Sequence, residues 1–330
     1  QPTERATFDR LTDARKWAAS IESSIREGRH FKTAEAKKHT LGEIVDRYLR
    51  DVLPSKSDSM QRDQWTQLSW WKDKIGNHLL SDIAPALIAE HRDLLLREIG
   101  MRGKKRSPAS VARHMAALSH AYTIAIKEWG WIDDNPLRKV QKPKEPRGRV
   151  RFLSDEEREK LLESCKNSEE PFLYHIVVLA LSTGARKSEI LNLTWADVDL
   201  QRKVAVLQQT KNDERRALPL AGEALECVKG LAGMRRIDTR LLFPDGSGKK
   251  PIIIRAPWHK ALKQAGIEDF RFHDLRHSAA SYLAMSGASL AEIAEVLGHK
   301  TLEMVKRYSH LSEQHTASVV EKMNKKFLGD

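Results

Sequence analysis

The stretch HDLRHSAASYLAMSGASLAEIAEVLGHKTLEMVKRYSHL, residues 273–311, decides how this sequence is interpreted. Its apolar residues recur at helical spacing, and Gly287 and Gly298 stand at positions typical of the residue that follows a helix. The pattern therefore predicts helices over residues 273–286, 289–297 and 301–308, with a last helix after Ser312.

The first part of this stretch places two groups suited to phosphate on one side of a helix. His273 and Arg276 are three residues apart, so they share a helix face, while Leu275 points toward the core. A planar guanidinium can bind two non-bridging phosphate oxygens, and an imidazole can donate a hydrogen bond or transfer a proton. Taken alone, the motif is equally typical of a solvated arginine and a structural histidine.

The end of the stretch carries a tyrosine between basic residues. His299 follows Gly298, and Tyr308 lies nine residues later, directly after Arg307. An activated nucleophile fits this pattern, but a single tyrosine is usually structural. Residues 289–299 also resemble the first helix and turn of a helix-turn-helix, which supports an alternative: a DNA-binding regulator without catalytic activity.

Two upstream segments add further basic groups. In residues 183–189, TGARKSE, a glycine precedes Arg186, and Glu189 shares the helix face of that arginine and can orient its guanidinium. An exposed ion pair that contributes little is the simpler explanation of this pair alone. Lys211 lies at the turn between predicted strands over residues 204–207 and 215–220, where a lysine is usually only solvated.

The composition favours a polyanionic partner. The 330 residues carry 57 Lys and Arg against 45 Asp and Glu, a formal charge of +12, and residues 101–150 alone hold 12 basic and 4 acidic side chains. Neutralising phosphates releases their counterions, so this stretch favours nucleic acid, although a solvated basic face is as common. The candidate DNA-binding residues in it are Lys104, Lys105, Arg106, Arg113, Lys142, Lys144, Arg147 and Arg149.

Other features exclude several classes of protein. No segment approaches the ~18 consecutive apolar residues of a membrane helix. Cys165 and Cys227 form no close pair and have no metal-ligand spacing, which favours a reducing cytoplasm over a disulfide scaffold or a structural zinc site. The sequence carries no recognisable carboxylate cluster for a metal and no glycine-rich phosphate loop, so we expect no cofactor.

The chain divides into a helical part and a mixed part. Residues 1–40 predict a tail and a helix, and residues 41–140 predict a small helical bundle. Residues 141–152, rich in proline and basic residues, predict an extended linker. Residues 153–330 begin with a capping box at Ser154 and predict helices around a short hairpin, so the expected fold is mainly α with a small antiparallel β-sheet. Within the bundle, helices are expected to start near Thr40, Ser57, Ile83 and Ser107.

Together, the singled-out groups would form a phosphoryl-transfer site. Cleaving a phosphodiester requires a nucleophile, positive charge at the equatorial oxygens and an acid for the leaving oxygen. The motifs resemble, in order, those of the phage-integrase, or tyrosine recombinase, family: Thr183-Gly184-x-Arg186-x-x-Glu189-Ile190, His273-x-x-Arg276-His277, Gly287, Leu297-Gly298-His299 and Tyr308-x-His310. The resemblance covers about residues 42–330, with a departure at Lys300, where the family more often has Ser or Thr.

The resemblance implies a site-specific DNA recombinase with a covalent intermediate. Tyr308 would attack the scissile phosphorus and form a 3′-phosphotyrosyl bond. Its phenol has a pKa near ~10, so the proton must leave during the attack, and the family pattern assigns His273 to assist that transfer. Lys211 would protonate the departing 5′-oxygen. The covalent bond conserves the energy of the phosphodiester, so religation would need neither ATP nor a metal.

The resemblance also implies which groups stabilise the transition state. Arg186 and Arg276 would bind the non-bridging oxygens, and His299 would donate a hydrogen bond to the phosphate. Glu189 would support this cluster. The helical domain of residues 41–140 corresponds to a core DNA-binding domain, and residues 153–330 correspond to a mixed α+β catalytic domain.

The resemblance implies partners as well. Family members act as homotetramers on two double-stranded DNA sites, with DNA-bending or directionality proteins as helpers, and a C-terminal helix would pack onto a neighbouring subunit. Residues 1–40 resemble the end of an arm-type DNA-binding domain whose start is missing, which favours an integrase of a phage or another mobile element in the bacterial cytoplasm. A type IB topoisomerase, which relaxes supercoils with a similar residue set, is the alternative in the same chemical class.

Overall fold

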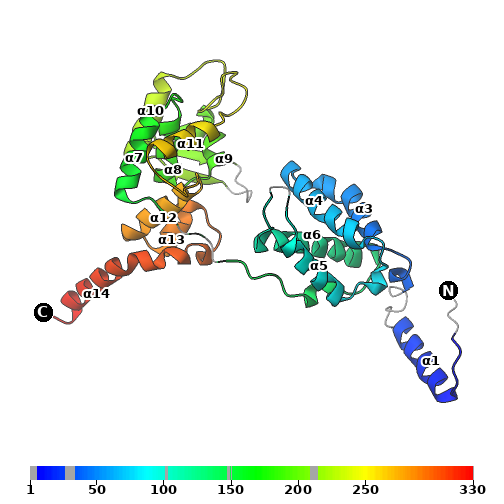
Figure 1. The fold of residues 1–330 in the computed structure, drawn as a ribbon. Coiled ribbons are helices and arrows are strands. Elements are labelled where there is room, and N and C mark those ends of the chain that lie inside the picture. The colour runs from blue at the N-terminus through cyan, green and yellow to red at the C-terminus, as the bar shows by residue number, and fades with distance from the viewer. Residues whose placement is uncertain are drawn as a thin grey trace. The chain divides into compact units, whose positions relative to one another are not determined.

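The computed structural model describes residues 6–26, 34–100, 103–146, 149, 151–208 and 215–329. The chain divides into two compact units, Gln1–Arg147 and Gly148–Asp330 (Figure 1). In the described part of the chain, no helix is both long and apolar enough to cross a membrane.

The N-terminal unit consists of helices joined by short turns. Trp71, Tyr48 and Tyr122 are the largest side chains of its core, and Trp71 Nε1 donates to the backbone carbonyl of His114 at 3.0 Å. The α-helices are α1 (Leu11–Arg26), α3 (Leu41–Asp51), α4 (Asp58–Ile75), α5 (Pro85–Arg97) and α6 (Pro108–Ile124). The turns are the 3₁₀ segments η1 (Leu53–Ser55), η2 (Leu80–Asp82) and η4 (Pro136–Lys139) and the π-helical segment η3 (Ala125–Trp129).

Capping residues set the starts of several helices. Thr40 and Ser154 form capping boxes with Glu43 and Glu157, and Ser107 accepts a hydrogen bond from the Ser110 amide at 3.2 Å. The expected starts near Thr40, Ser57 and Ser107 are therefore confirmed. The third helix begins at Pro85 rather than near Ile83, because a proline is favoured in the first helical turn and disfavours helical geometry before it.

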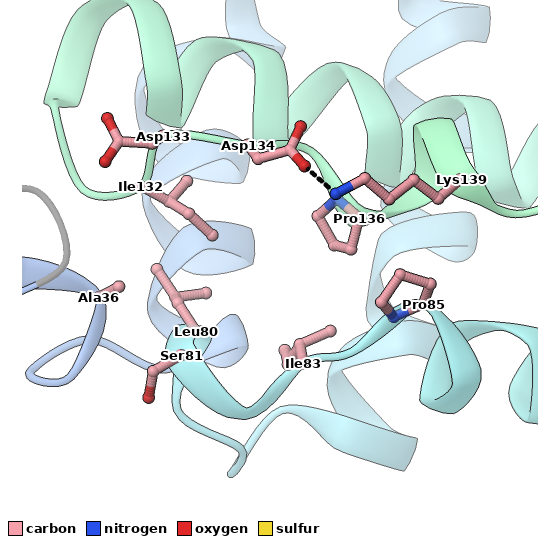
Figure 2. Close-up of a pocket in the computed structure, with 10 residues that line it drawn as sticks. All are labelled: Ala36, Leu80, Ser81, Ile83, Pro85, Ile132, Asp133, Asp134, Pro136 and Lys139. Carbon is pink, nitrogen blue, oxygen red and sulfur yellow. Dashed lines mark ion pairs between the residues drawn. The ribbon is translucent and has the colours of Figure 1, made fainter. Parts of the chain in front are cut away.

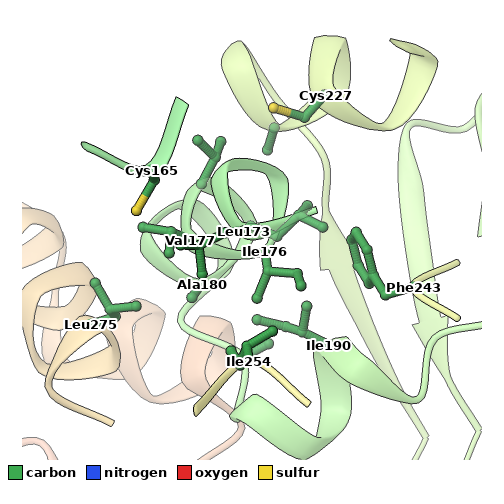
Figure 3. Close-up of a cluster of buried hydrophobic side chains, with 14 of the residues drawn as sticks. Cys165, Leu173, Ile176, Val177, Ala180, Ile190, Cys227, Phe243, Ile254 and Leu275 are labelled. Carbon is green, nitrogen blue, oxygen red and sulfur yellow. The ribbon is translucent and has the colours of Figure 1, made fainter. Parts of the chain in front are cut away.

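Helix α8 (Leu173–Thr183) runs through the core of the C-terminal unit. Most of its side chains are buried, and Figure 3 shows Leu173, Ile176 and Val177 among side chains from other elements of the unit. A helix that is apolar nearly all round needs neighbours on several sides. These neighbours are α7 (Asp155–Lys166), α10 (Glu223–Gly233) and α12 (Asp274–Met285), while α11 (Arg255–Gln264) packs against α7.

The small antiparallel sheet that the sequence predicted lies beside these helices, and it has a third strand, β1 (Val198–Asp199), that was not predicted. Its order is β1, β2 (Val204–Leu207) and β3 (Arg216–Pro219), and the turn η5 (Trp195–Asp197) precedes it. Ala205 pairs with Leu218 across the sheet, and both side chains are buried. Alternate residues of a strand point to the same face, so Arg216 shares the inner face with Leu218.

Helix α10 was not predicted. Ala224, Val228 and Leu231 follow helical spacing and are buried, which is the signal that could have identified it. Glycines at 222, 230 and 233 obscured that signal because glycine lowers helix propensity.

The segment after α13 (Leu290–Leu297) differs from the predicted helix over residues 301–308. It forms two 3₁₀ segments, η6 (Leu302–Met304) and η7 (Lys306–Ser312), before α14 (Glu313–Phe327). A 3₁₀ helix has three residues per turn, which places Val305 and Tyr308 on one face, and both are buried. The second helix that a helix-turn-helix regulator would use is therefore absent from residues 301–312, which the structure describes.

Gly184 allows two helices to approach each other at the C-terminal end of α8. Its φ of +60° is in the left-handed region, and a Cβ at this position would lie 2.3 Å from Leu297 Cδ2, whose side chain is fully buried. A side chain here would therefore meet both backbone strain and a steric clash.

We predict that Gly184→Ala lowers the free energy of unfolding more than Gly266→Ala does. Gly266 also has a positive φ, +68°, but its added Cβ would meet nothing within 4 Å. Both variants carry a backbone cost of roughly 1–3 kcal/mol, and only Gly184→Ala adds the clash. Denaturant unfolding of the two variants measures the difference, and equal losses would contradict the close packing at Gly184.

Candidate active site

Arg276 is a buried cation without a complete set of partners. It lies in the first turn of α12, is 4% exposed, and donates from Nη1 to the carbonyl of Gly184 at 2.6 Å. Its Nη2 is buried and has no hydrogen-bond partner among the described residues. Burial, together with the charges of Arg186 and Arg216, lowers the pKa of Arg276 to about 10. The guanidinium remains charged at pH 7, and its free nitrogen is suited to an anion.

Glu189 is shared by two arginines. Arg186 precedes α9 (Lys187–Leu191) and donates to Glu189 twice, from its backbone amide at 2.8 Å and from Nη1 at 2.6 Å. Arg216 approaches Glu189 Oε2 with Nη2 at 3.4 Å. Burial opposes ionisation of Glu189, but the hydrogen bonds from Arg186 and the charges of both arginines hold its pKa below the usual value. Among the described residues, this one carboxylate therefore balances only part of the positive charge in the cluster.

His299 faces the same cations. Gly298 ends α13 with a φ of +64°, and His299 follows it. The Nδ1 atom of His299 is buried without a partner in the described part of the chain. Burial, followed by the charges of Arg276 and Arg186, lowers the pKa of His299 to about 4. The imidazole is therefore neutral at pH 7, and one of its nitrogens can donate a hydrogen bond to a bound anion.

Tyr308 is buried in η7 and is hydrogen-bonded to His277 of α12. The two partners are the Tyr308 hydroxyl and Nδ1 of His277. Burial raises the pKa of Tyr308, and burial with the nearby His273 lowers the pKa of His277 to about 4. At pH 7 the phenol is therefore protonated and shares a hydrogen bond with a neutral imidazole. This contact places the tyrosine hydroxyl beside the helix that carries Arg276.

The structure gathers most of the predicted catalytic residues in one place. His273 is exposed at the start of α12, with its ring centroid 5.5 Å from that of His277. Lys211 lies outside the described residues. The predicted residues that come together are Arg186, Glu189, Arg276, His299 and Tyr308.

Two members of the cluster were not singled out from the sequence. His277 appeared only as part of a motif, and its contact with Tyr308 depends on the 3₁₀ path of residues 302–312. Arg216 lies two and four residues before the buried Leu218 and Leu220. Residues two apart in a strand share a face, and this period of two is the signal that the side chain of Arg216 points inward.

The predicted DNA-binding residues fall into two groups. Arg106 pairs with Glu98 at 2.8 Å, and Arg149 pairs with Asp269 at 2.6 Å and with Asp274 at 3.2 Å. These two side chains are therefore bound to carboxylates rather than freely solvated. Arg147 lies outside the described residues. The remaining predicted cations are exposed: Lys104, Lys105, Arg113, Lys142 and Lys144.

A pocket in the N-terminal unit has a different character. Figure 2 shows it between apolar side chains such as Leu80 and Ile83, with Asp134 paired to Lys139 at 2.7 Å. Its volume is about 300 Å³, and none of the predicted site residues lines it. Among the residues that the structure describes, no three His, Cys, Asp or Glu side chains are grouped so as to hold a metal ion.

Comparison with known sequences identifies the relatives of this chain. The sequence profile described as the phage integrase family matches residues 151–315. The chain is 34% identical over 277 residues to the shufflon-specific DNA recombinase of Escherichia coli, which covers 83% of this chain and 70% of that protein. It is 37% identical over 230 residues to the integrase of Salmonella phage P22, which covers 64% of this chain and 57% of that protein.

Comparison with solved structures identifies proteins with a fold similar to that of this chain. A Tn1549 transposon integrase in complex with a circular intermediate DNA matches with a TM-score of 0.70 at 18% identity, over 86% of this chain and 99% of that one. A lambda integrase dimer bound to a COC′ core site matches with a TM-score of 0.66 at 22% identity, over 83% of this chain and 97% of that one.

The two neutral histidines make the stability of the DNA-free protein depend on pH. Histidines titrate near ~6.5 in an unfolded chain, whereas the folded values of His277 and His299 are about 4. Between these pH values the unfolded chain binds more protons than the folded protein does. The free energy of unfolding is therefore highest above about pH 6.5 and decreases as the pH falls toward 4.

We predict that the double variant His277→Asn with His299→Asn loses less melting temperature between pH 7 and pH 5 than the unsubstituted protein does. Calorimetry of the full chain measures this slope, and His259→Asn, at an exposed position of α11, serves as the control. A slope unchanged in the double variant would show that these imidazoles are not the groups that stay neutral.

Proposed function

The chain belongs to the phage integrase family, and from this premise we propose that it is a site-specific DNA recombinase that cleaves and rejoins strands through Tyr308. The observation that carries the proposal is the cluster of the partly exposed Arg186 with the largely buried Arg216 and Arg276. Among the described residues this cluster has one carboxylate, Glu189, and unpaired donor nitrogens next to a tyrosine. Such a cluster favours an anion with several oxygens, and a phosphodiester supplies one.

The proposed reaction is a direct displacement at phosphorus. Tyr308 forms a bond to the scissile phosphorus while the bond to the 5′-oxygen breaks, which leaves a 3′-phosphotyrosyl link. The phenol proton leaves toward the histidines beside it, with His273 in the role that the family pattern assigns. Lys211 supplies a proton to the departing 5′-oxygen. The reverse attack by a 5′-hydroxyl releases Tyr308 and reseals a strand without ATP.

The remaining cluster residues stabilise the transition state. Arg186 and Arg276 bind the non-bridging oxygens, and His299 donates a hydrogen bond to one of them. Glu189 fixes Arg186 through the bonds at 2.6 and 2.8 Å. These cations are placed before the reaction begins, so little reorganisation is needed when charge develops on the phosphate.

DNA binding outside the site would use both units. We assign residues 41–140 to core DNA binding, residues 141–152 to a basic linker, and residues 1–40 to the end of an arm-type domain. Arg106 and Arg149 are held by carboxylates and would contribute less than the exposed cations, which are Lys104, Lys105, Arg113, Lys142 and Lys144.

Assembly on DNA is part of the proposal. A lambda integrase tetramer bound to a Holliday junction is among the structural neighbours, with a TM-score of 0.63 at 21% identity. Val320, Met323 and Phe327 of α14 are exposed, an arrangement suited to docking on a neighbouring subunit of a homotetramer. We infer that strands of two DNA sites are exchanged in this assembly, with DNA-bending or directionality proteins as helpers.

Arg276→Ala is expected to lower the rate of strand cleavage by at least ~10²–10³-fold, the usual loss for one donor to a developing oxyanion. The matched control is Arg271→Ala, which removes an exposed arginine from the residues just before α12. The substrate is a plasmid that carries both end sequences of the protein's own element, and recombinant products are counted with and without each substitution.

The same assay separates recombination from the topoisomerase alternative. Relaxation of a plasmid that lacks any end sequence, without recombinants on the other plasmid, would favour a type IB topoisomerase. Near-normal recombination by Arg276→Ala would contradict the assignment of Arg276.

A further inference from the structure

Arg216 is a buried arginine that the proposed reaction does not use directly. It begins β3, its side chain is 10% exposed, and it lies within the cation cluster rather than on the surface. Burying a guanidinium is costly unless hydrogen bonds and charges compensate it. The contacts of Arg216 therefore indicate which segments it holds.

Arg216 connects two segments that are far apart in the sequence. Its Nη1 donates to the carbonyl of Leu297, at the end of α13, and its Nη2 approaches Glu189 Oε2 at 3.4 Å. Glu189 in turn holds Arg186 through two hydrogen bonds. One guanidinium thus joins the segment that carries Arg186 to the segment that leads into His299.

Gly298 shows how closely this arginine is packed. A Cβ at residue 298 would lie 2.4 Å from Nη1 and 2.7 Å from Cδ of Arg216. The φ of Gly298 is +64°, so a side chain would be strained there as well. The backbone just before His299 is therefore built against the guanidinium of Arg216.

The charges around Arg216 indicate that stability alone does not explain it. Glu189 is the carboxylate it contacts, and that carboxylate is already engaged by Arg186. Its Nε is buried without a partner among the described residues, and burial lowers the pKa of Arg216. Replacing a buried ion pair by apolar packing of similar volume is often neutral or stabilising, so the pair alone is weak evidence that Arg216 is there for stability.

We propose that Arg216 is a positioning residue that keeps the Arg186–Glu189 pair and the His299 segment in register around the scissile phosphate. This inference rests on the proposed strand-cleavage function, and Arg216 acts on the reaction through its neighbours.

The test compares Arg216→Met with Arg215→Met. Methionine keeps much of the length of the side chain but removes the donors, and Arg215 is an exposed arginine one residue away. Single-turnover formation of the covalent complex is measured at saturating DNA with two substrates: a normal scissile phosphate and a methylphosphonate at the same position. A methylphosphonate lacks one anionic oxygen, so cleavage of it depends less on correctly placed cations.

Arg216→Met is expected to slow cleavage of the phosphate by about 10–100-fold, the loss typical of residues that orient the ligands of a charged centre. The loss on the methylphosphonate should be clearly smaller, and Arg186→Ala, measured in parallel, should show the same substrate dependence. Arg215→Met should match the unsubstituted protein on both substrates. Thermal melting checks folding, and Arg216→Lys, which keeps the charge, replaces Arg216→Met if that variant does not fold.

Equal losses on the two substrates, or no loss on the phosphate, would overturn the positioning role. If the unsubstituted protein forms no covalent complex at all, the proposed cleavage function fails instead. The two failures are therefore distinguishable in one experiment.

Discussion

Three guanidinium groups around one carboxylate, among the described residues, are the constraint on which the rest of the C-terminal unit depends. Arg186, Arg216 and Arg276 are buried to different degrees, and Glu189 is the acid that contacts two of them. Cations buried without full compensation are costly, so the fold must hold them by many contacts until an anion arrives. Helix α8, strand β3 and helices α9, α12 and α13 converge here, and Gly184 and Gly298 permit the close approach.

The position of Tyr308 depends on the same convergence. Tyr308 is buried because residues 302–312 follow a 3₁₀ path that directs Val305 and Tyr308 inward. His277, held neutral by burial, shares a hydrogen bond with the Tyr308 hydroxyl beside Arg276. The proposed attack therefore begins from a protonated tyrosine, and its proton must move as the bond to phosphorus forms. Arg276 and His277 are neighbours on helix α12, which couples the position of the guanidinium to that of the histidine that contacts Tyr308.

The sequence predicted much of this site because its chemistry follows local spacing. His273 and Arg276 at i and i+3, the capping boxes and the glycines after helices are local patterns, and these define most of the fold. Sequence analysis did not identify Arg216 and His277, because their contacts are with residues 81 and 31 positions away along the chain. The 3₁₀ segments escaped for a related reason: a repeat of three resembles helical spacing until tertiary packing decides between them.

Covalent trapping on DNA most directly tests whether Tyr308 is the nucleophile. The protein would be mixed with nicked duplexes from the ends of its own element, without added metal, and separated on a denaturing gel. We expect a protein–DNA band whose modified peptide, by mass spectrometry, contains Tyr308, and we expect Tyr308→Phe to abolish the band. A covalent band that persists in Tyr308→Phe would instead place the nucleophile on another residue.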